Sequence, residues 1–259
     1  MIPIYDDNPQ HRTPIVTYTF IAANALAWLL LQNAGFGIKF EQSICQFGFI
    51  PVQFLGSETP TACPSQGSLA TINLLNSIFM HGSWMHILGN MLFLWIFGGN
   101  IEDAMGRLRF VVFYLLCGFA ASFAQLLANP NSIIPMVGAS GAIGGLMGAY
   151  IILFPKARIK VLVPIFFIFT VVAVPSYVML GLWFALQLFD GINTMSSNSS
   201  GGVAFWAHVG GFVVGAASIY LFKDDELLAD HLHAGWKTKP MARDVWDDPK
   251  NRQKRREND

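Results

Sequence analysis

Residues 110–155, FVVFYLLCGFAASFAQLLANPNSIIPMVGASGAIGGLMGAYIILFP, run for 46 residues without one Asp, Glu, Lys or Arg. About 20 apolar residues suffice for one helix to cross a bilayer, so this run is long enough for two. Asn and Pro at 128–132 disfavour a helix and favour a turn. We therefore predict two consecutive membrane-spanning helices that meet at this turn.

The rest of the chain shows the same segregation of charge. Only 12% of its 259 residues are charged, against about 25% in a typical soluble domain. Four further charge-free runs lie at 13–38, 69–101, 161–189 and 191–222. The chain is therefore predicted to be an all-α membrane protein, a bundle of six transmembrane helices. Its expected spans are 14–33, 83–101, 108–127, 139–155, 161–187 and 203–222.

The basic residues between the spans predict how the helices are oriented. With the N-terminus in the cytoplasm, six basic residues before position 223 fall inside and only Lys39 falls outside. An excess of Lys and Arg on the cytoplasmic side is typical of multi-pass proteins. We expect an integral protein of the cell (inner) membrane with both termini cytoplasmic. Residues 1–222 would form the membrane domain and residues 223–259 a polar cytosolic tail.

A long external segment, 34–68, separates the first two spans. It is rich in apolar side chains and is expected to lie at the membrane interface. Cys45 and Cys63 both fall within it. They would form a disulfide bond in an oxidising compartment and remain two free thiols otherwise. Both possibilities stay open at this stage.

One serine and three histidines stand out in these charge-free runs: Ser140, His81, His86 and His208. A serine hydroxyl is a weak nucleophile until a base takes its proton, and imidazole is the usual base near neutral pH. Spans two, four and six would all run from outside to inside. This orientation places His86, Ser140 and His208 at comparable depth in the outer part of the membrane.

Small residues at helical spacing flank both Ser140 and His208, and such stripes let helix backbones approach closely in lipid. They are Gly141, Gly144, Gly145 and Gly148 in span four, and Ala204, Ala207, Gly211, Gly215 and Ser218 in span six. Packing of these stripes would bring His208 against Ser140. Since no Asp or Glu lies inside a span, a serine–histidine dyad is expected rather than a triad.

The second span adds two hydrogen-bond donors. His86 and Asn90 are four residues apart, share one helix face and can both donate to an oxyanion. The same pair can also simply join two helices, and a serine among glycines more often bonds to its own helix backbone. His81 and His86, five residues apart without a nearby Cys or carboxylate, are poorly placed to hold a metal, so no metal is expected. The coincidence of depth favours catalysis over these structural interpretations.

Three motifs, in this order, resemble those of the rhomboid family of intramembrane serine proteases. They are His86-Ile87-Leu88-Gly89-Asn90, Gly138-Ala139-Ser140-Gly141 and Ala207-His208-Val209-Gly210-Gly211, and the stretch from His81 to His86 is similar to the family's paired histidines. The resemblance covers about 14–222. It implies Ser140 as nucleophile and His208 as general base. It also implies an oxyanion site of His86, Asn90 and the Ser140 amide, supported by Gly138, Gly141 and His81.

The resemblance implies cleavage of transmembrane segments of other membrane proteins near the outer face, within the lipid bilayer. No cofactor and no nucleic acid are expected. Span five and the loop at 189–202 would gate substrate entry. The family often has a tyrosine four residues after the serine, where this chain has Gly144, so Phe205 or Trp206 is expected to support His208. Two alternatives are a catalytically silent membrane chaperone of the same fold and a proton-coupled transporter, which would need inverted repeats and a midplane site.

Overall fold

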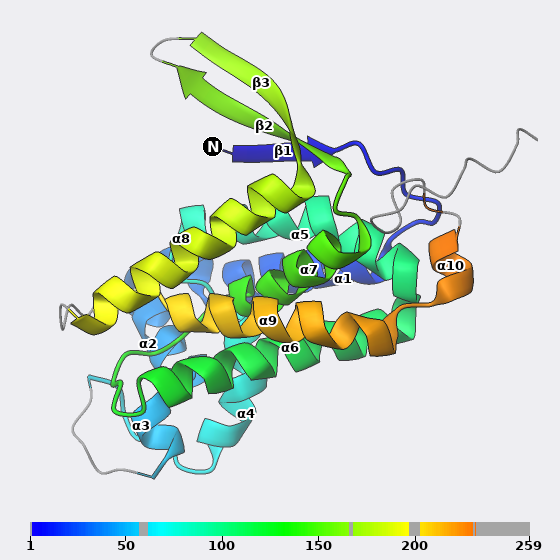
Figure 1. Cartoon of the computed structure of the whole chain (residues 1–259). Coiled ribbons are helices and arrows are strands. Elements are labelled where there is room, and N and C mark those ends of the chain that lie inside the picture. Colours follow the sequence, from blue (N-terminus) through cyan, green and yellow to red (C-terminus); the bar gives the residue numbers. More distant parts are fainter. Residues whose placement is uncertain (1, 57–61, 166–167, 197–202, 230, 232–259) are drawn as a thin grey trace, which may run out of the picture.

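The structure is a computed structural model that describes residues 2–56, 62–165, 168–196, 203–229 and 231. Within these residues it consists of helices with one small sheet (Figure 1). The α-helices are α1 (Ile15–Leu26), α2 (Gly37–Phe47), α3 (Pro51–Phe54), α4 (Leu69–Asn76), α5 (Trp84–Met105), α6 (Arg107–Ala128), α7 (Ser140–Leu153), α8 (Ser176–Ser196), α9 (Phe205–Phe222) and α10 (Asp225–Ala229). A π-helical turn, Ala27–Leu31, continues α1, and the strands are β1 (Ile2–Asp6), β2 (Arg158–Ile165) and β3 (Ile168–Pro175).

Helices occupy five of the six expected spans. These are α1 with its π-helical continuation, α5, α6, α7 and α9. Among the described residues, α6 and α9 are both long and apolar enough to cross a membrane by themselves. The charge-free segments at these five spans therefore correspond to helices, as expected from their length.

The expectation for the fifth span is wrong in its first half. Residues 158–165 and 168–175 form strands instead: β2 pairs antiparallel with β3, and β1 pairs with the other edge of β2. The stretch is rich in Val and Ile, which favour strands, and Pro164 lacks the amide hydrogen that a helix interior needs. The helix begins only after Pro175 and extends to Ser196. The fold is thus mostly helical but not all-α, and the external loop expected at 189–202 is helical as far as residue 196.

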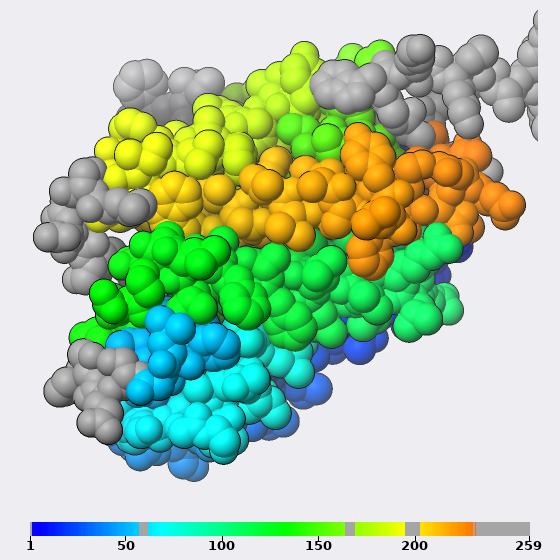
Figure 2. Space-filling model, turned by 60° about the horizontal axis from the view of Figure 1, so that its bottom comes forward, coloured from blue at the N-terminus to red at the C-terminus, as the bar shows by residue number. Residues whose placement is uncertain are grey.

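The central helix of the bundle is α7, which packs against α5, α6, α8 and α9. Its closest partner is α9, and the contact runs along the predicted glycine stripes. A Cβ atom added to Gly215 would lie 2.1 Å from the carbonyl oxygen of Gly145, and one added to Gly148 would lie 2.1 Å from that of Phe212. Figure 2 shows α8 (yellow) and α6 (green) on either side of α9 (orange).

Carboxylates at the end of α5 anchor the N-terminal segment. Glu102 accepts hydrogen bonds from the backbone amides of Val16 (3.0 Å) and Thr17 (2.8 Å) and from the Thr17 hydroxyl (2.8 Å). It therefore caps the N-terminus of α1, whose first amides have no partner within the helix. Asp103 accepts from the amide of His11 at 2.6 Å. The first part of the expected tail also packs here, because the amide of Asp224 donates to the carbonyl of Ala104 at 2.9 Å.

The described residues of the segment 34–68, which is expected to be external, contact the loop that leads into α7. The sulfur atoms of Cys45 and Cys63 are 2.01 Å apart, so the structure joins them in a disulfide. Phe49 and Met136 exchange two backbone hydrogen bonds of 2.9 and 2.8 Å. The buried Gln66 donates to the carbonyls of Cys45 and Gly48. The described part of the segment 34–68 therefore holds the loop at 132–138 in place through these backbone contacts.

Candidate active site

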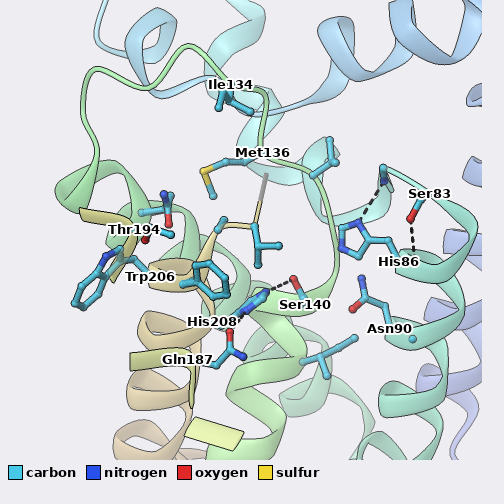
Figure 3. A pocket seen from close by; sticks show the side chains of 18 of the residues that line it. Ser83, His86, Asn90, Ile134, Met136, Ser140, Gln187, Thr194, Trp206 and His208 are labelled. Carbon is cyan, nitrogen blue, oxygen red and sulfur yellow. Dashed lines mark hydrogen bonds between the residues drawn. The ribbon is translucent and has the colours of Figure 1, made fainter. Parts of the chain in front are cut away.

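The beginnings of α7 and α9 bring Ser140 and His208 together. Ser140 is the first residue of α7, and His208 lies in the first turn of α9. The Nε2 atom of His208 is 2.7 Å from the Ser140 Oγ atom, although the two residues are 68 positions apart in the sequence (Figure 3). This is a hydrogen-bond distance, and it is the geometry that activates a serine hydroxyl.

A glutamine on α8 holds the other side of the His208 ring. The Nδ1 atom of His208 is 2.6 Å from the Oε1 atom of Gln187. An amide oxygen can only accept a hydrogen bond, so the neutral ring carries its proton on Nδ1. The Nε2 atom is then unprotonated and can take the proton of Ser140. Gln187 was not expected to belong to the site. The available signal was a single amide in the charge-free run 161–189.

The aromatic neighbour of His208 also differs from the expectation. The ring of Trp183, one turn before Gln187 on α8, has its centroid 5.9 Å from that of His208, with the planes at 37°. Phe205 and Trp206 line the pocket instead, and Trp206 lies against Gly191 of α8. The expected support from Phe205 or Trp206 is therefore wrong, because α8 supplies both the ring and the acceptor.

His86 of α5 faces the dyad across the pocket (Figure 3). Its Nδ1 atom accepts a hydrogen bond of 3.3 Å from the amide of Gly82, so the neutral ring carries its proton on Nε2. A Cβ atom added to Gly138 would lie 2.7 Å from this Nε2 atom and 3.5 Å from the Ser140 Oγ atom. Gly138 also has a φ of +132°, which favours glycine. The close approach and the backbone conformation both exclude a side chain there.

Asn90 lies one turn after His86 on the same helix and is buried. Within the described part of the chain, its Nδ2 atom has no hydrogen-bond partner. A buried amide donor without a partner is costly, and such groups often serve a functional site. The Ser140 amide is a third donor, since the first amides of a helix have no partner within the helix. Three donors thus lie around the serine, as an oxyanion site requires.

His81 and Gly141 have structural roles. The backbone of fully buried His81 exchanges two 2.7 Å hydrogen bonds with the side chain of Gln32. Its ring packs edge-on against His86 with the centroids 5.1 Å apart. Gly141 lies at the contact between α7 and α6, where an added Cβ atom would be 2.4 Å from that of Ala121.

A cavity of about 750 Å³ opens over the dyad. Its walls come from α5, the loop at 132–137, α8 and α9. Most of the lining is apolar, and Met85, Phe93, Met136, Val137, Trp183 and Phe205 contribute to it. A cavity of this size has room for several residues of an extended peptide beside the serine.

A serine hydroxyl beside a histidine ring nitrogen, with amide and imidazole donors around it, is an arrangement of the kind that serine hydrolases use, here at the end of a helix bundle. The chain belongs to the rhomboid family, a family of integral membrane proteins, because residues 69–224 match the Rhomboid domain. This match includes all of α4 to α9 and therefore every residue of the site described above.

Individual relatives agree with this assignment. The chain is 31% identical over 154 residues to Rhomboid protein 1, mitochondrial, of Saccharomyces cerevisiae, covering 56% of this chain and 40% of that protein. It is 34% identical over 108 residues to Rhomboid-like protease 5 of Toxoplasma gondii, covering 37% and 12%. It is 32% identical over 109 residues to the mouse presenilin-associated rhomboid-like protein, mitochondrial, covering 41% and 29%. The chain thus spans less than half the length of each of these relatives.

Proposed function

We propose that this protein is an intramembrane serine endopeptidase that cleaves transmembrane segments of other membrane proteins near the outer face. The observation that carries the proposal is the 2.7 Å contact between Ser140 Oγ and His208 Nε2, with the opposite ring nitrogen bound to Gln187. A serine that merely packs in a helix has no need of a histidine whose tautomer leaves the facing nitrogen unprotonated. The family match supports this choice.

The geometry supports hydrolysis through an acyl-enzyme. Ser140 Oγ attacks the carbonyl carbon of the scissile peptide bond while His208 Nε2 takes its proton. The amide of Ser140, His86 Nε2 and Asn90 Nδ2 stabilise the oxyanion. His208 then protonates the leaving amine, and the acyl-enzyme forms. A water molecule then attacks the ester carbonyl while His208 Nε2 takes one of its protons. As the bond to Ser140 Oγ breaks, His208 returns that proton to the serine oxygen, so the new carboxylate is released and the dyad is restored.

In the membrane, α1, α5, α6, α7, α8 and α9 would form a six-span bundle. The 21 residues of α8 rise about 30 Å, the thickness of the hydrocarbon core of a bilayer. Large apolar side chains on the outer faces of these helices are exposed, among them Leu116, Phe123, Val213 and Leu221. Lipid would cover them. Both termini would lie in the cytoplasm of a cell whose inner membrane holds the protein. Six of the seven basic residues before position 223 would then fall on the cytoplasmic side, as is typical of multi-pass proteins.

The test is cleavage of a model single-span substrate by the purified protein in proteoliposomes. Ser140→Ala and His208→Ala should each abolish cleavage, and Ser140→Ala should also abolish labelling by a fluorophosphonate. The matched control is Ser218→Ala, since Ser218 on α9 bonds only to its own helix at Val214 in the described contacts. Cleavage that survives Ser140→Ala would refute the proposal. A wild type that binds the substrate without cleaving it would favour a silent chaperone of this fold.

A further inference from the structure

We propose that Gln187 is a positioning residue that keeps the proton of neutral His208 on Nδ1. Because Gln187 belongs to α8, we further infer that the alignment of the base depends on where α8 lies. This inference rests on the proposed protease function and concerns the same site. It assigns to α8 a part in catalysis that the dyad residues do not explain.

His208 needs a hydrogen-bond acceptor at Nδ1 because only one of the two tautomers of its neutral ring can act as a base toward Ser140. A ring with its proton on Nε2 would donate to Ser140 Oγ and could not act as a base. A ring with its proton on Nδ1 needs an acceptor on that side, since a buried donor without a partner is unfavourable. The 2.6 Å contact with Gln187 Oε1 supplies this acceptor. A neutral amide does so without placing a second charge in an apolar site, which would be costly.

The three helices that carry Ser140, Gln187 and His208 are not held equally firmly. Ser140 and His208 lie on α7 and α9, which contact each other backbone to backbone through glycines. In contrast, α8 is attached to α9 through side chains. The ring of Phe184 stacks on Phe212 with centroids 4.5 Å apart, and Trp183 contacts the same ring at 6.2 Å. The Ser140–His208 contact is thus built on the firmer pair of helices, and Gln187 on the less firmly held helix.

The exposure of the outer face of α8 also indicates that this helix is held less firmly than α7 and α9. Leu182, Leu186, Phe189 and Ile192 are all about half exposed, so among the described residues no protein layer covers that side (Figure 2). A small outward shift of α8 would lengthen the Gln187–His208 contact before it disturbed the dyad distance. The base would then lose the acceptor that selects its productive tautomer.

Among the residues that the structure describes, few other titratable groups face His208. His86 of α5 lies across the pocket, and Asp190 lies nearly one turn beyond Gln187 on α8. The helices α7 and α9 carry no Asp, Glu, Lys or Arg. A change at position 187 is therefore expected to act on His208 directly, which makes the pH dependence of cleavage a suitable measurement.

The first experiment compares kcat, KM and the pH–rate profile of Gln187→Leu and Gln187→Glu in proteoliposomes. Gln187→Leu should lower kcat roughly 10- to 100-fold with little change in KM. Gln187→Glu keeps an acceptor and adds a charge that stabilises the imidazolium. It should stay within about tenfold of the wild-type rate, while the acidic limb of its profile moves to higher pH. Leu186→Ala, the neighbouring and half-exposed position, is the control and should behave like wild type.

A double-mutant cycle tests the dependence on α8. Phe184→Ala removes the stacking on Phe212 and should lower kcat several-fold in the wild type, but not further when Gln187 is already Leu. Additive effects would overturn the coupling to α8. A Gln187→Leu variant with wild-type kcat, or a Gln187→Glu variant with an unshifted profile, would overturn the positioning role. Failure of the wild type to cleave would instead refute the proposed function, so the two failures are distinguishable.

Discussion

The backbone of Gly211 in α9 lies directly against the carbonyl group of Gly141 in α7. A Cβ atom added to Gly211 would be 2.0 Å from the carbonyl oxygen of Gly141. Gly141 follows Ser140, and Gly211 lies three residues after His208. The contact between these glycines therefore sets the separation of the two helices at the level of the dyad, where any side chain would push them apart.

Gly211→Ala should accordingly impair both folding and catalysis. Overpacking of a tight contact typically costs about 1–3 kcal/mol, and a wider helix separation would break the 2.7 Å contact between Ser140 and His208. We expect a lower thermal unfolding midpoint in detergent and at least about a tenfold loss of cleavage. Gly181→Ala on α8 is the control, since an added Cβ atom there meets nothing within 4 Å. Equal behaviour of the two variants would contradict the role of the glycine contact.

The oxyanion donors should affect the chemical step more than substrate binding. His86→Ala or Asn90→Ala removes one donor, and loss of one such donor typically costs about 10²–10³ in kcat. KM should change little, because these donors act on charge that develops in the transition state. Steady-state kinetics on the model substrate measure both quantities. An increase in KM at unchanged kcat would assign the two residues to substrate binding instead.

Asp6 predicts a dependence of stability on pH. In β1 it accepts hydrogen bonds from the Tyr150 hydroxyl of α7 and, at 2.8 Å, from Asn100 of α5. Burial raises the pKa of the Asp6 carboxyl from 3.8 to about 6, an effect that the hydrogen bond from Tyr150 partly opposes. The folded state thus holds the proton up to about pH 6, whereas the unfolded chain loses it near 3.8. The stability that the protonated Asp6 carboxyl contributes is therefore complete below pH 3.8, and it is lost as the pH rises to about 6.

Asp6→Asn should remove this dependence while keeping an oxygen that can accept both hydrogen bonds. After allowance for its partial exposure, the variant should gain about 1–2 kcal/mol relative to wild type above pH 6. Thermal unfolding of both proteins between pH 4 and pH 8 measures the difference. Parallel curves for wild type and variant across this range would show that the carboxyl does not titrate as described.

The cap that Glu102 provides for α1 should be important for stability. Glu102→Ala leaves the amides of Val16 and Thr17 without their acceptor, which we expect to cost about 2–4 kcal/mol of unfolding free energy. Glu226→Ala, at an exposed carboxylate of α10, should stay within about 0.5 kcal/mol of wild type. Unfolding midpoints of the two variants in the same detergent make the comparison. A Glu102→Ala variant as stable as the control would show that α1 holds its position without this cap.

The positions of most helices could be predicted because lipid demands long charge-free segments, and such segments are visible in the amino-acid order. Ser140, His86, Asn90 and His208 were recognisable for a related reason, since polar side chains are rare in these runs. The strands at 158–165 and 168–175 were missed because a run of Val and Ile is apolar whether it becomes a strand or a helix. The pairing of the first of these strands with Ile2–Asp6 joins segments far apart in the chain and leaves no local signal.

The amino-acid order thus defines which residues are available for the chemistry and places them at one depth, because depth follows from counting along each helix. Rotation about the helix axes and the distance between helices do not follow from such counting. The 2.7 Å contact of His208 with Ser140 and the 2.6 Å contact with Gln187 require α7, α8 and α9 to pack at one separation and one rotation. Hydrogen bonds weaken steeply with small errors in distance and angle. The identity of the residue that holds His208 therefore emerges only from the packing of these three helices.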